Sequence, residues 1–207
     1  VEPQRIAAAV RPGTRLVIVN HQSNVNGVVQ PVAAIKATVG DIPVLLDLAQ
    51  SAGHEEIMLD AWNIAYAAFT GHKGLMGPTG TGGFFVANPA SVHPGVFGGT
   101  GSRSDSFDMP DFTPDRFEAG TPNVAGAVAL GVALAVTERD RITVSSRVRD
   151  HAERLIDGLT GSVDHVRTTI PPRSVDGVAN IVHLSCREVA SEPLLFLLDE
   201  AGVAASA

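Results

Sequence analysis

Short apolar runs alternate with helical stretches and polar turns through the first half of the chain. Four of these runs have the length and composition of buried strands: residues 16–19, 43–46, 65–69 and 83–86. Such runs are typical of the sheet of an α/β protein. Between the first two runs, residues 31–39 place Ile35 and Val39 at helical spacing, which predicts a crossover helix. Because a crossover of this kind joins parallel strands, we expect a mostly parallel sheet.

The second half of the chain has fewer strand-like runs and more helical spacing. Residues 88–114 are dominated by Pro, Gly, Ser and Asp, so we expect a long ordered loop of the kind that serves a site. Small residues from Val124 through Leu130 and Leu134 predict a tightly packed helix. The other expected elements are a helix over 145–159, a loop over 162–176 inside a smaller C-terminal domain, a strand over 179–184 and a helix over 193–198.

Composition and charge narrow the classes of function. With 44% hydrophobic and 18% charged residues the chain is ordinary for a soluble globular protein, and its apolar runs are too short to span a membrane. A formal net charge of -7 provides no basic surface for a nucleic acid, so a small-molecule partner is favoured. The single cysteine, Cys186, cannot form an internal disulfide, which suits a reducing cytoplasm. We therefore expect a cytoplasmic protein that binds neither membrane nor nucleic acid.

Lys73 and Asp47 each follow a predicted strand. Lys73 lies in the segment Thr-Gly-His-Lys-Gly after the run 65–69, and Asp47 follows the run 43–46. The carboxyl ends of parallel strands are where open α/β sheets bind ligands. A lysine there can form a Schiff base with the aldehyde of pyridoxal phosphate, and a carboxylate can keep its pyridine nitrogen protonated. Taken singly, a solvated loop lysine and a helix N-cap are the better interpretations, but together the two residues make the cofactor interpretation at least as good.

Two further polar clusters have both a functional and a structural interpretation. Asn24, in the segment after the first strand, could bond a cofactor oxygen or a substrate carboxylate, or simply form an Asx turn. Thr121 could donate to a phosphate at a helix N-terminus, or cap that helix. The glycine-rich segment 77–83 lacks a Walker ending and leads into a strand, so we interpret it as a turn that allows close backbone approach. The histidines have no metal-ligand spacing, so no metal site is expected, and Cys186 is interpreted as a structural thiol.

Read in order, five segments resemble the class V aminotransferase family of pyridoxal-phosphate enzymes, and within it the cysteine desulfurase and selenocysteine lyase-like members. The segments are VNHQSNVNGVVQP, LLDLAQSAG, AFTGHKGLMGPTGTGG, GGTGSRSDS and PDRFEAGTPN. The resemblance covers nearly the whole chain and implies the α/β fold called fold type I of the PLP-dependent transferases. It implies that residues 1–140 are part of the large cofactor-binding domain and 141–207 part of a small α+β C-terminal domain.

The resemblance also implies a role for each site residue. Lys73 would be the lysine that bonds the cofactor, Asp47 would pair with the pyridine nitrogen, and Gln50 would bond the phenolic oxygen. Thr70 and His72 would hold the phosphate. Asn24 would lie near the substrate and the cofactor oxygen, and Thr121 would reach the phosphate of the neighbouring subunit's cofactor in a homodimer.

The activity that the resemblance implies is removal of sulfur from L-cysteine, giving L-alanine and an enzyme persulfide, with a sulfur-acceptor protein and iron–sulfur cluster assembly as its context. Selenocysteine is the other candidate substrate. The catalytic cysteine of the family has no match in this chain, and the chain begins with Val1, so we expect an internal fragment with little activity of its own. The alternatives are another class V activity, an aminotransferase or a carbon–sulfur lyase, and a non-catalytic scaffold of the same fold.

Overall fold

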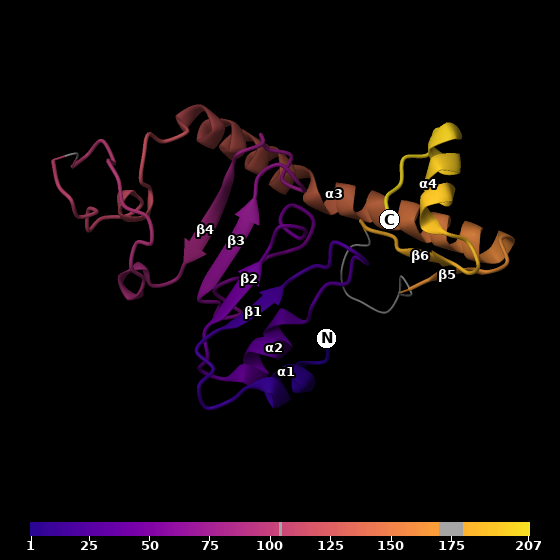
Figure 1. Cartoon of the computed structure of the whole chain (residues 1–207), viewed down its shortest axis with the longest axis horizontal. Coiled ribbons are helices and arrows are strands. Elements are labelled where there is room, and N and C mark those ends of the chain that lie inside the picture. Colours follow the sequence, from indigo (N-terminus) through magenta and orange to yellow (C-terminus); the bar gives the residue numbers. More distant parts are fainter. Residues whose placement is uncertain (104, 170–179) are drawn as a thin grey trace.

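A four-stranded sheet, a long helix and a small C-terminal unit make up the structure (Figure 1), a computed structural model that describes residues 1–103, 105–169 and 180–207. The elements of the first half are α1 (Pro3–Ala9), β1 (Val17–Asn20), α2 (Val32–Val39), β2 (Val44–Asp47), β3 (Tyr66–Thr70) and β4 (Gly82–Val86). Those of the second half are the 3-10 turns η1 (Pro89–Ser91) and η2 (Asp115–Phe117), then α3 (Val124–Ser162), β5 (Val166–Thr168), β6 (Leu184–Cys186) and α4 (Ser191–Glu200). None of the described helices is long and apolar enough to cross a bilayer.

The sheet confirms the four predicted strands and their mostly parallel arrangement. Its order is β1-β2-β3-β4, with β1, β2 and β3 parallel and β4 antiparallel to β3. The crossover between β1 and β2 is α2, as expected, whereas β3 returns into β4 through the short connection 71–81, which gives an antiparallel pair. Asn20 pairs with Asp47, and Asp47 pairs with Ala68, so the three parallel strands end at the same edge.

One face of the sheet holds the core. Val19, Leu46 and Ala67 lie side by side on neighbouring strands and are buried together with Ile35 and Val39 of α2. The helical spacing of these two α2 residues places both on the side that faces the sheet.

The opposite face of the sheet is more exposed than the sequence predicts. Ile18 is 67% exposed, and Phe84, which stacks on Tyr66, is 56% exposed. Runs that are apolar at every position predict strands covered on both faces. In this chain β1 and β2 instead alternate between buried and partly exposed positions, so the prediction of buried strands is correct for one face only.

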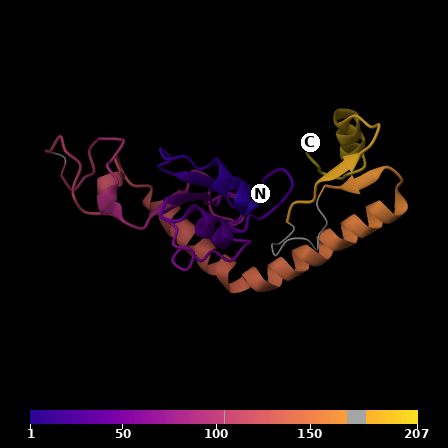
Figure 2. The ribbon, with the colours of Figure 1, turned by 90° about the horizontal axis from the view of Figure 1, so that it is seen from below.

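α3 is a single helix of 39 residues where the sequence predicts two helices with a break between them. The two predicted helices, from Val124 through Leu134 and over 145–159, leave residues 135–144 unassigned. These residues contain no proline or glycine, and the helix continues through them with Arg141 and Glu138 paired at 3.2 Å. The predicted domain boundary at 140/141 falls inside this helix and stays a prediction. Figure 2 shows α3 running along one side of the molecule, from the sheet to the C-terminal unit.

The C-terminal unit differs from the prediction in the position of its strand. The strand expected over 179–184 is β6, at Leu184–Cys186, paired antiparallel with β5; residue 179 lies outside the described residues. Ile181, which suggested a strand, instead packs against the loop after β1, where a Cβ on Gly27 would meet the Ile181 carbonyl oxygen at 2.6 Å. The loop expected over 162–176 contains β5, and its residues 170–176 are not described. The helix expected over 193–198 is confirmed inside α4.

The long polar segment 88–114 is confirmed as a connection without strands or α-helices, apart from Ser104, which is not described. It begins after β4, which runs antiparallel to the other strands. It therefore leaves the sheet at the end where β1, β2 and β3 begin, opposite their carboxyl ends. In Figure 1 it projects away from the sheet before the chain returns into α3. Whether it serves a site stays a prediction.

Candidate functional site

Six of the seven predicted site residues lie at the carboxyl edge of the parallel strands. They are Asn24, Asp47, Gln50, Thr70, His72 and Lys73, each at the end of β1, β2 or β3 or in the loop that follows. Thr121 stands apart: it is exposed just before α3, and no contact recorded among the described residues joins it to the other six. The topology of the sheet, rather than any short motif, therefore brings most of the candidate site together.

Asp47 combines the two roles that the sequence left open. Its Oδ1 atom accepts a hydrogen bond from the Ala49 amide at 2.9 Å, which is the expected capping bond. That bond opens a single helical turn, closed by the Ala52 amide donating to the Leu48 carbonyl at 2.9 Å. Within the described part of the chain the Oδ2 atom has no hydrogen-bond partner, so the half-buried carboxylate caps its own loop and retains one oxygen for a ligand. Gln50 is half-buried in the middle of this turn.

The loop that carries Lys73 is fixed at both ends by backbone hydrogen bonds. The Gly77 amide donates to the Gly71 carbonyl at 2.7 Å, and the Met76 amide donates to the Lys73 carbonyl at 2.8 Å. Lys73 itself is exposed at the tip of the loop. Its amine is thus held on a short, closed loop and is open to a ligand.

Thr70 and His72 form a polar pair at the start of the same loop. The Thr70 hydroxyl and the His72 Nδ1 atom are 2.9 Å apart, and the His72 side chain is exposed. A hydroxyl and an imidazole side by side supply hydrogen-bond donors for an anion such as a phosphate. The structure therefore places the two predicted phosphate ligands next to each other.

Glycines allow the Gln50 loop and the Lys73 loop to touch. A Cβ on Gly74 would lie 2.5 Å from the Ala52 carbonyl oxygen, closer than any real side chain approaches. Gly53 makes the same contact from the other side, and a Cβ there would meet the Gly74 backbone. The predicted close approach in the glycine-rich turn is confirmed by Gly82, where a Cβ would lie 2.6 Å from the Phe69 carbonyl oxygen.

His21 also lies at this end of the sheet, although it is not among the seven predicted site residues. It directly follows β1, is 3% exposed, and its Nδ1 atom lies 2.9 Å from the Ser51 hydroxyl. Its ring packs edge-on against Trp62, with centroids 5.6 Å apart, and burial lowers the pKa of His21 to about 4. The available signal was its position, because His21 directly follows β1, whose last residue, Asn20, pairs with Asp47 at the end of β2.

Asn24 lies at the exposed tip of the loop after β1, and the turn there is built by its neighbours. The Ser23 hydroxyl accepts from the Val25 amide at 3.2 Å, and the Gly27 amide donates to the Ser23 carbonyl at 3.0 Å. The Asx turn that we considered for Asn24 is thus a serine turn in the structure. Next to it, the buried Gln22 amide donates to the Asn180 side chain, which connects this loop to the C-terminal half.

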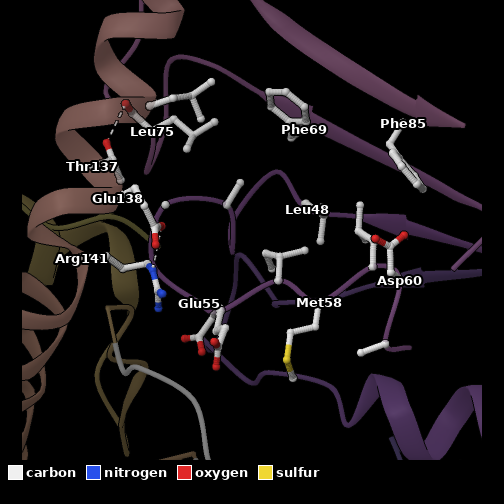
Figure 3. Close-up of a pocket in the computed structure, with 17 residues that line it drawn as sticks. Leu48, Glu55, Met58, Asp60, Phe69, Leu75, Phe85, Thr137, Glu138 and Arg141 are labelled. Atoms are coloured by element: carbon white, nitrogen blue, oxygen red, sulfur yellow. Dashed lines mark hydrogen bonds and ion pairs between the residues drawn. The ribbon is translucent and has the colours of Figure 1, made fainter. Parts of the chain in front are cut away.

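A cavity of roughly 730 Å³ lies on the core side of these loops and holds none of the seven predicted residues (Figure 3). Phe69 and Phe85 line it from the sheet, and Thr137 of α3 closes one side by donating to the Leu75 carbonyl at 3.2 Å. Cys186, at the end of β6, is half-buried. It neither lines this cavity nor belongs to the loops that carry the predicted residues.

Comparisons with known proteins identify the family. The chain matches the model of the family described as aminotransferase class V over residues 1–207. It is 35% identical to a protein named probable cysteine desulfurase from Methanothermobacter thermautotrophicus, over 97% of this chain and 51% of that protein. A protein of the same name from Pyrococcus abyssi is 31% identical, over 91% of this chain and 48% of its own length.

Solved structures agree with the predicted fold. The apo cysteine desulfurase of Thermococcus onnurineus superposes with a TM-score of 0.82 at 26% identity, covering 99% of this chain and 52% of that one. A protein titled NifS-like superposes with a TM-score of 0.85 at 21% identity, covering 100% of this chain and 53% of its own. The α/β architecture of PLP fold type I is therefore confirmed, and the chain spans about half the length of the curated relatives it matches. On the family model and these relatives together, the chain belongs to the class V aminotransferase family.

Proposed function

We propose that this chain forms the pyridoxal-phosphate-binding part of a cysteine desulfurase, with Lys73 as the lysine that bonds the cofactor. The observation that supports this most directly is the contact between two loops at one sheet edge. The turn that holds Gln50, opened by Asp47, touches the closed loop that holds Lys73, through Gly53 and Gly74. Asp47, Gln50 and Lys73, which would contact the pyridine nitrogen, the phenolic oxygen and the aldehyde of the cofactor, are thus held close together.

The donor set of this edge fits pyridoxal phosphate. Asp47 has a carboxylate oxygen to spare for the pyridine nitrogen, and Gln50 has an amide for the phenolic oxygen. Thr70 and His72, already paired at 2.9 Å, would hold the phosphate. Lys73 offers an exposed amine for the aldehyde. Each polar group of the cofactor has a partner of suitable chemistry, so the residues present fit it.

The protein's residues would bind and orient, while the cofactor would supply the electron sink. When bound, pyridoxal phosphate accepts the electrons released at the substrate carbon. The Asp47 carboxylate would hold a proton on the pyridine nitrogen, which keeps the ring cationic. Lys73 Nζ would move a proton at the substrate carbon. Asn24, on the exposed tip beside this edge, would contact the substrate and the phenolic oxygen.

The substrate and partners are proposed from the names of the relatives. Proteins named probable cysteine desulfurase support cysteine as the substrate. Selenocysteine as the other candidate substrate, a sulfur-acceptor protein and iron–sulfur cluster assembly stay proposals that come from the resemblance of the sequence. We also propose a cytoplasmic homodimer in which Thr121 reaches the cofactor phosphate of the partner subunit. The exposure of Thr121 supports that role.

Borohydride reduction tests the cofactor lysine directly, because the chain contains only two lysines, Lys36 and Lys73. Incubation with pyridoxal phosphate, reduction and peptide mass spectrometry should place the pyridoxyl label on Lys73. The matched variants are Lys73→Arg, which should lose the label, and Lys36→Arg, which should keep it. Lys36 lies at the end of α2, where it donates to the Ile42 carbonyl at 3.2 Å and does not face the cluster. Equal labelling of both lysines, or of the N-terminal amine alone, would contradict the assignment.

A second candidate is a class V lyase or aminotransferase that uses no persulfide cysteine, because Cys186 does not lie in the candidate site. Cys186 is in the β5–β6 ladder, and no contact among the described residues connects it to the Lys73 loop. For the same reason we expect little desulfurase activity from these 207 residues alone. In a longer protein that contains this chain, formation of alanine and a cysteine persulfide would support the desulfurase, whereas pyruvate without persulfide would support the lyase. A chain that keeps the fold and takes no label would support the scaffold alternative.

A further inference from the structure

His21 joins the end of β1 to the turn that carries Gln50. Its Nδ1 atom lies 2.9 Å from the Ser51 hydroxyl, and both side chains are buried, His21 at 3% and Ser51 at 0% exposed. A backbone hydrogen bond also joins the end of β1 to the end of β2, since the His21 amide donates to the Asp47 carbonyl at 2.9 Å. A hydrogen bond between two buried side chains, each in the loop after a different strand, restricts the movement of the turn that carries Gln50.

The turn over residues 48–52 begins with the Leu48 amide donating to the Ala68 carbonyl of β3 at 2.8 Å. Three further anchors hold it, and His21 supplies the one that comes from the end of β1. The first anchor is Asp47 Oδ1, which accepts from the Ala49 amide at 2.9 Å. The second is the bond from the Ala52 amide to the Leu48 carbonyl at 2.9 Å. The third is the contact from His21 to Ser51. Gln50 stands between the first and the third anchors, so its backbone position depends on both.

The imidazole is suited to this role because it stays neutral. The Trp62 ring packs against it in a T-shaped arrangement at a centroid distance of 5.6 Å, and burial lowers the pKa of His21 to about 4. A neutral imidazole can form one hydrogen bond with the Ser51 hydroxyl, as donor or as acceptor, without placing a charge beside the cofactor site.

We propose that His21 is a positioning residue: through Ser51 it fixes the turn that holds Gln50 at the phenolic oxygen of pyridoxal phosphate. His21 does not touch the cofactor in this proposal, and it acts only by where it holds Gln50. The inference rests on the proposed function, because it assumes that Lys73 bonds the cofactor. It assigns a role to a residue outside the predicted set of seven.

The first test measures the turn without cofactor. Hydrogen–deuterium exchange at pH 7 should show the Ala52 and His54 amides exchanging at least tenfold faster in His21→Ala, because the turn loses its third anchor. His21→Asn should restore protection, since an asparagine amide can reach the Ser51 hydroxyl from nearly the same place as Nδ1. Ser51→Ala should match His21→Ala, and this variant keeps the buried ring in place if His21→Ala folds poorly.

The second test reads the cofactor's spectrum rather than activity. After loading with pyridoxal phosphate, the pH midpoint of the absorbance band should shift by about half a unit or more in Ser51→Ala, in the same direction as in Gln50→Ala. The double variant Ser51→Ala with Gln50→Ala should shift no further, because both changes act on one contact. Trp62→Phe, which keeps an aromatic ring against His21, should leave the midpoint unchanged.

The outcomes separate this inference from the proposed function. If the wild-type chain takes no label on Lys73, the proposed function fails and this inference fails with it. If Lys73 is labelled but the Ser51→Ala and His21→Ala midpoints equal that of the wild type, His21 is structural only and the inference is overturned. A further shift in the double variant would also overturn it, because the serine would then act independently of Gln50.

Discussion

Gly74 shows how one hydrogen atom in place of a side chain can hold a site together. A Cβ at this position would lie 2.5 Å from the Ala52 carbonyl, which is backbone and cannot rotate away. We expect Gly74→Ala to lower the free energy of unfolding by about 1–3 kcal/mol, as overpacking does elsewhere, and to reduce labelling of Lys73 next to it. Urea denaturation and the borohydride assay measure the two effects.

The matched control for that substitution is Gly131→Ala in α3. Gly131 has nothing within 4 Å of an added Cβ, and it lies inside the helix. The same substitution there should raise stability, by up to about 1 kcal/mol, because alanine is the better helix former. Equal effects at the two glycines would show that the contact between the loops does not limit the site.

The free energy of unfolding should depend on pH between about 4 and 6.5, because burial lowers the pKa of His21. Burial lowers the pKa of His21 to about 4 and also lowers that of His54, whereas in the unfolded chain both take a proton near 6.5. The contribution of His21 is fully present above pH 6.5 and is lost as the pH falls toward 4, because the unfolded chain then binds more protons. His54 acts in the same direction. For His21 alone the loss between pH 7 and pH 5 should be about 2 kcal/mol.

Variants isolate the histidine from the carboxylates that also titrate. His21→Asn cannot take up a proton, so the difference in unfolding free energy between pH 7 and pH 5 should shrink by about 2 kcal/mol. His151→Gln, on the exposed surface of α3, should leave that difference unchanged. The hypothesis fails if both variants show the wild-type pH dependence in urea titrations.

Single residues of the site were predictable where strand order determined their place. Lys73 and Asp47 could be found because each follows an apolar run, and parallel strands end at one edge. His21 was missed because a histidine after a strand is usually a solvated loop residue, and its partner Ser51 lies 30 residues further along the chain. A contact between side chains on two different loops leaves no periodic signal in either segment.

At the scale of elements, local patterns predicted strands better than helix ends. The four runs of the first half became strands because alternation and turn residues act over a few positions. α3 is predicted as two helices because its first part has a pattern of small residues and residues 145–159 carry charges on one face, yet no proline or glycine between the two parts stops a helix. β6 was placed too early, because its register depends on the pairing of Cys186 with Val166, and apolar residues before it pack elsewhere.

At the scale of the whole molecule, the bare face of the sheet is the main departure from the predicted fold. An α/β sheet with mostly parallel strands is normally covered on both faces, but Ile18 and Phe84 are more than half exposed here. Among the described residues, the two outer strands, β1 and β4, each pair with a single neighbour, which leaves backbone groups open along both outer strands. The exposure of this face could not be predicted from the composition of the strands, because it depends on which segments of the chain pack against the sheet.

An exposed apolar face on a sheet with open edges should cause the 207-residue chain to self-associate. We expect sedimentation velocity to show a concentration-dependent increase in mass at tens of micromolar, and Phe84→Lys to suppress it by placing a charge in the middle of the face. The matched control is Phe107→Lys, at a fully exposed phenylalanine in the long loop that projects away from the sheet (Figure 1), and this variant should associate as the wild type does. If both variants suppress association equally, net charge rather than the sheet face controls it, and a wild-type chain that stays monomeric would show that the face needs no cover.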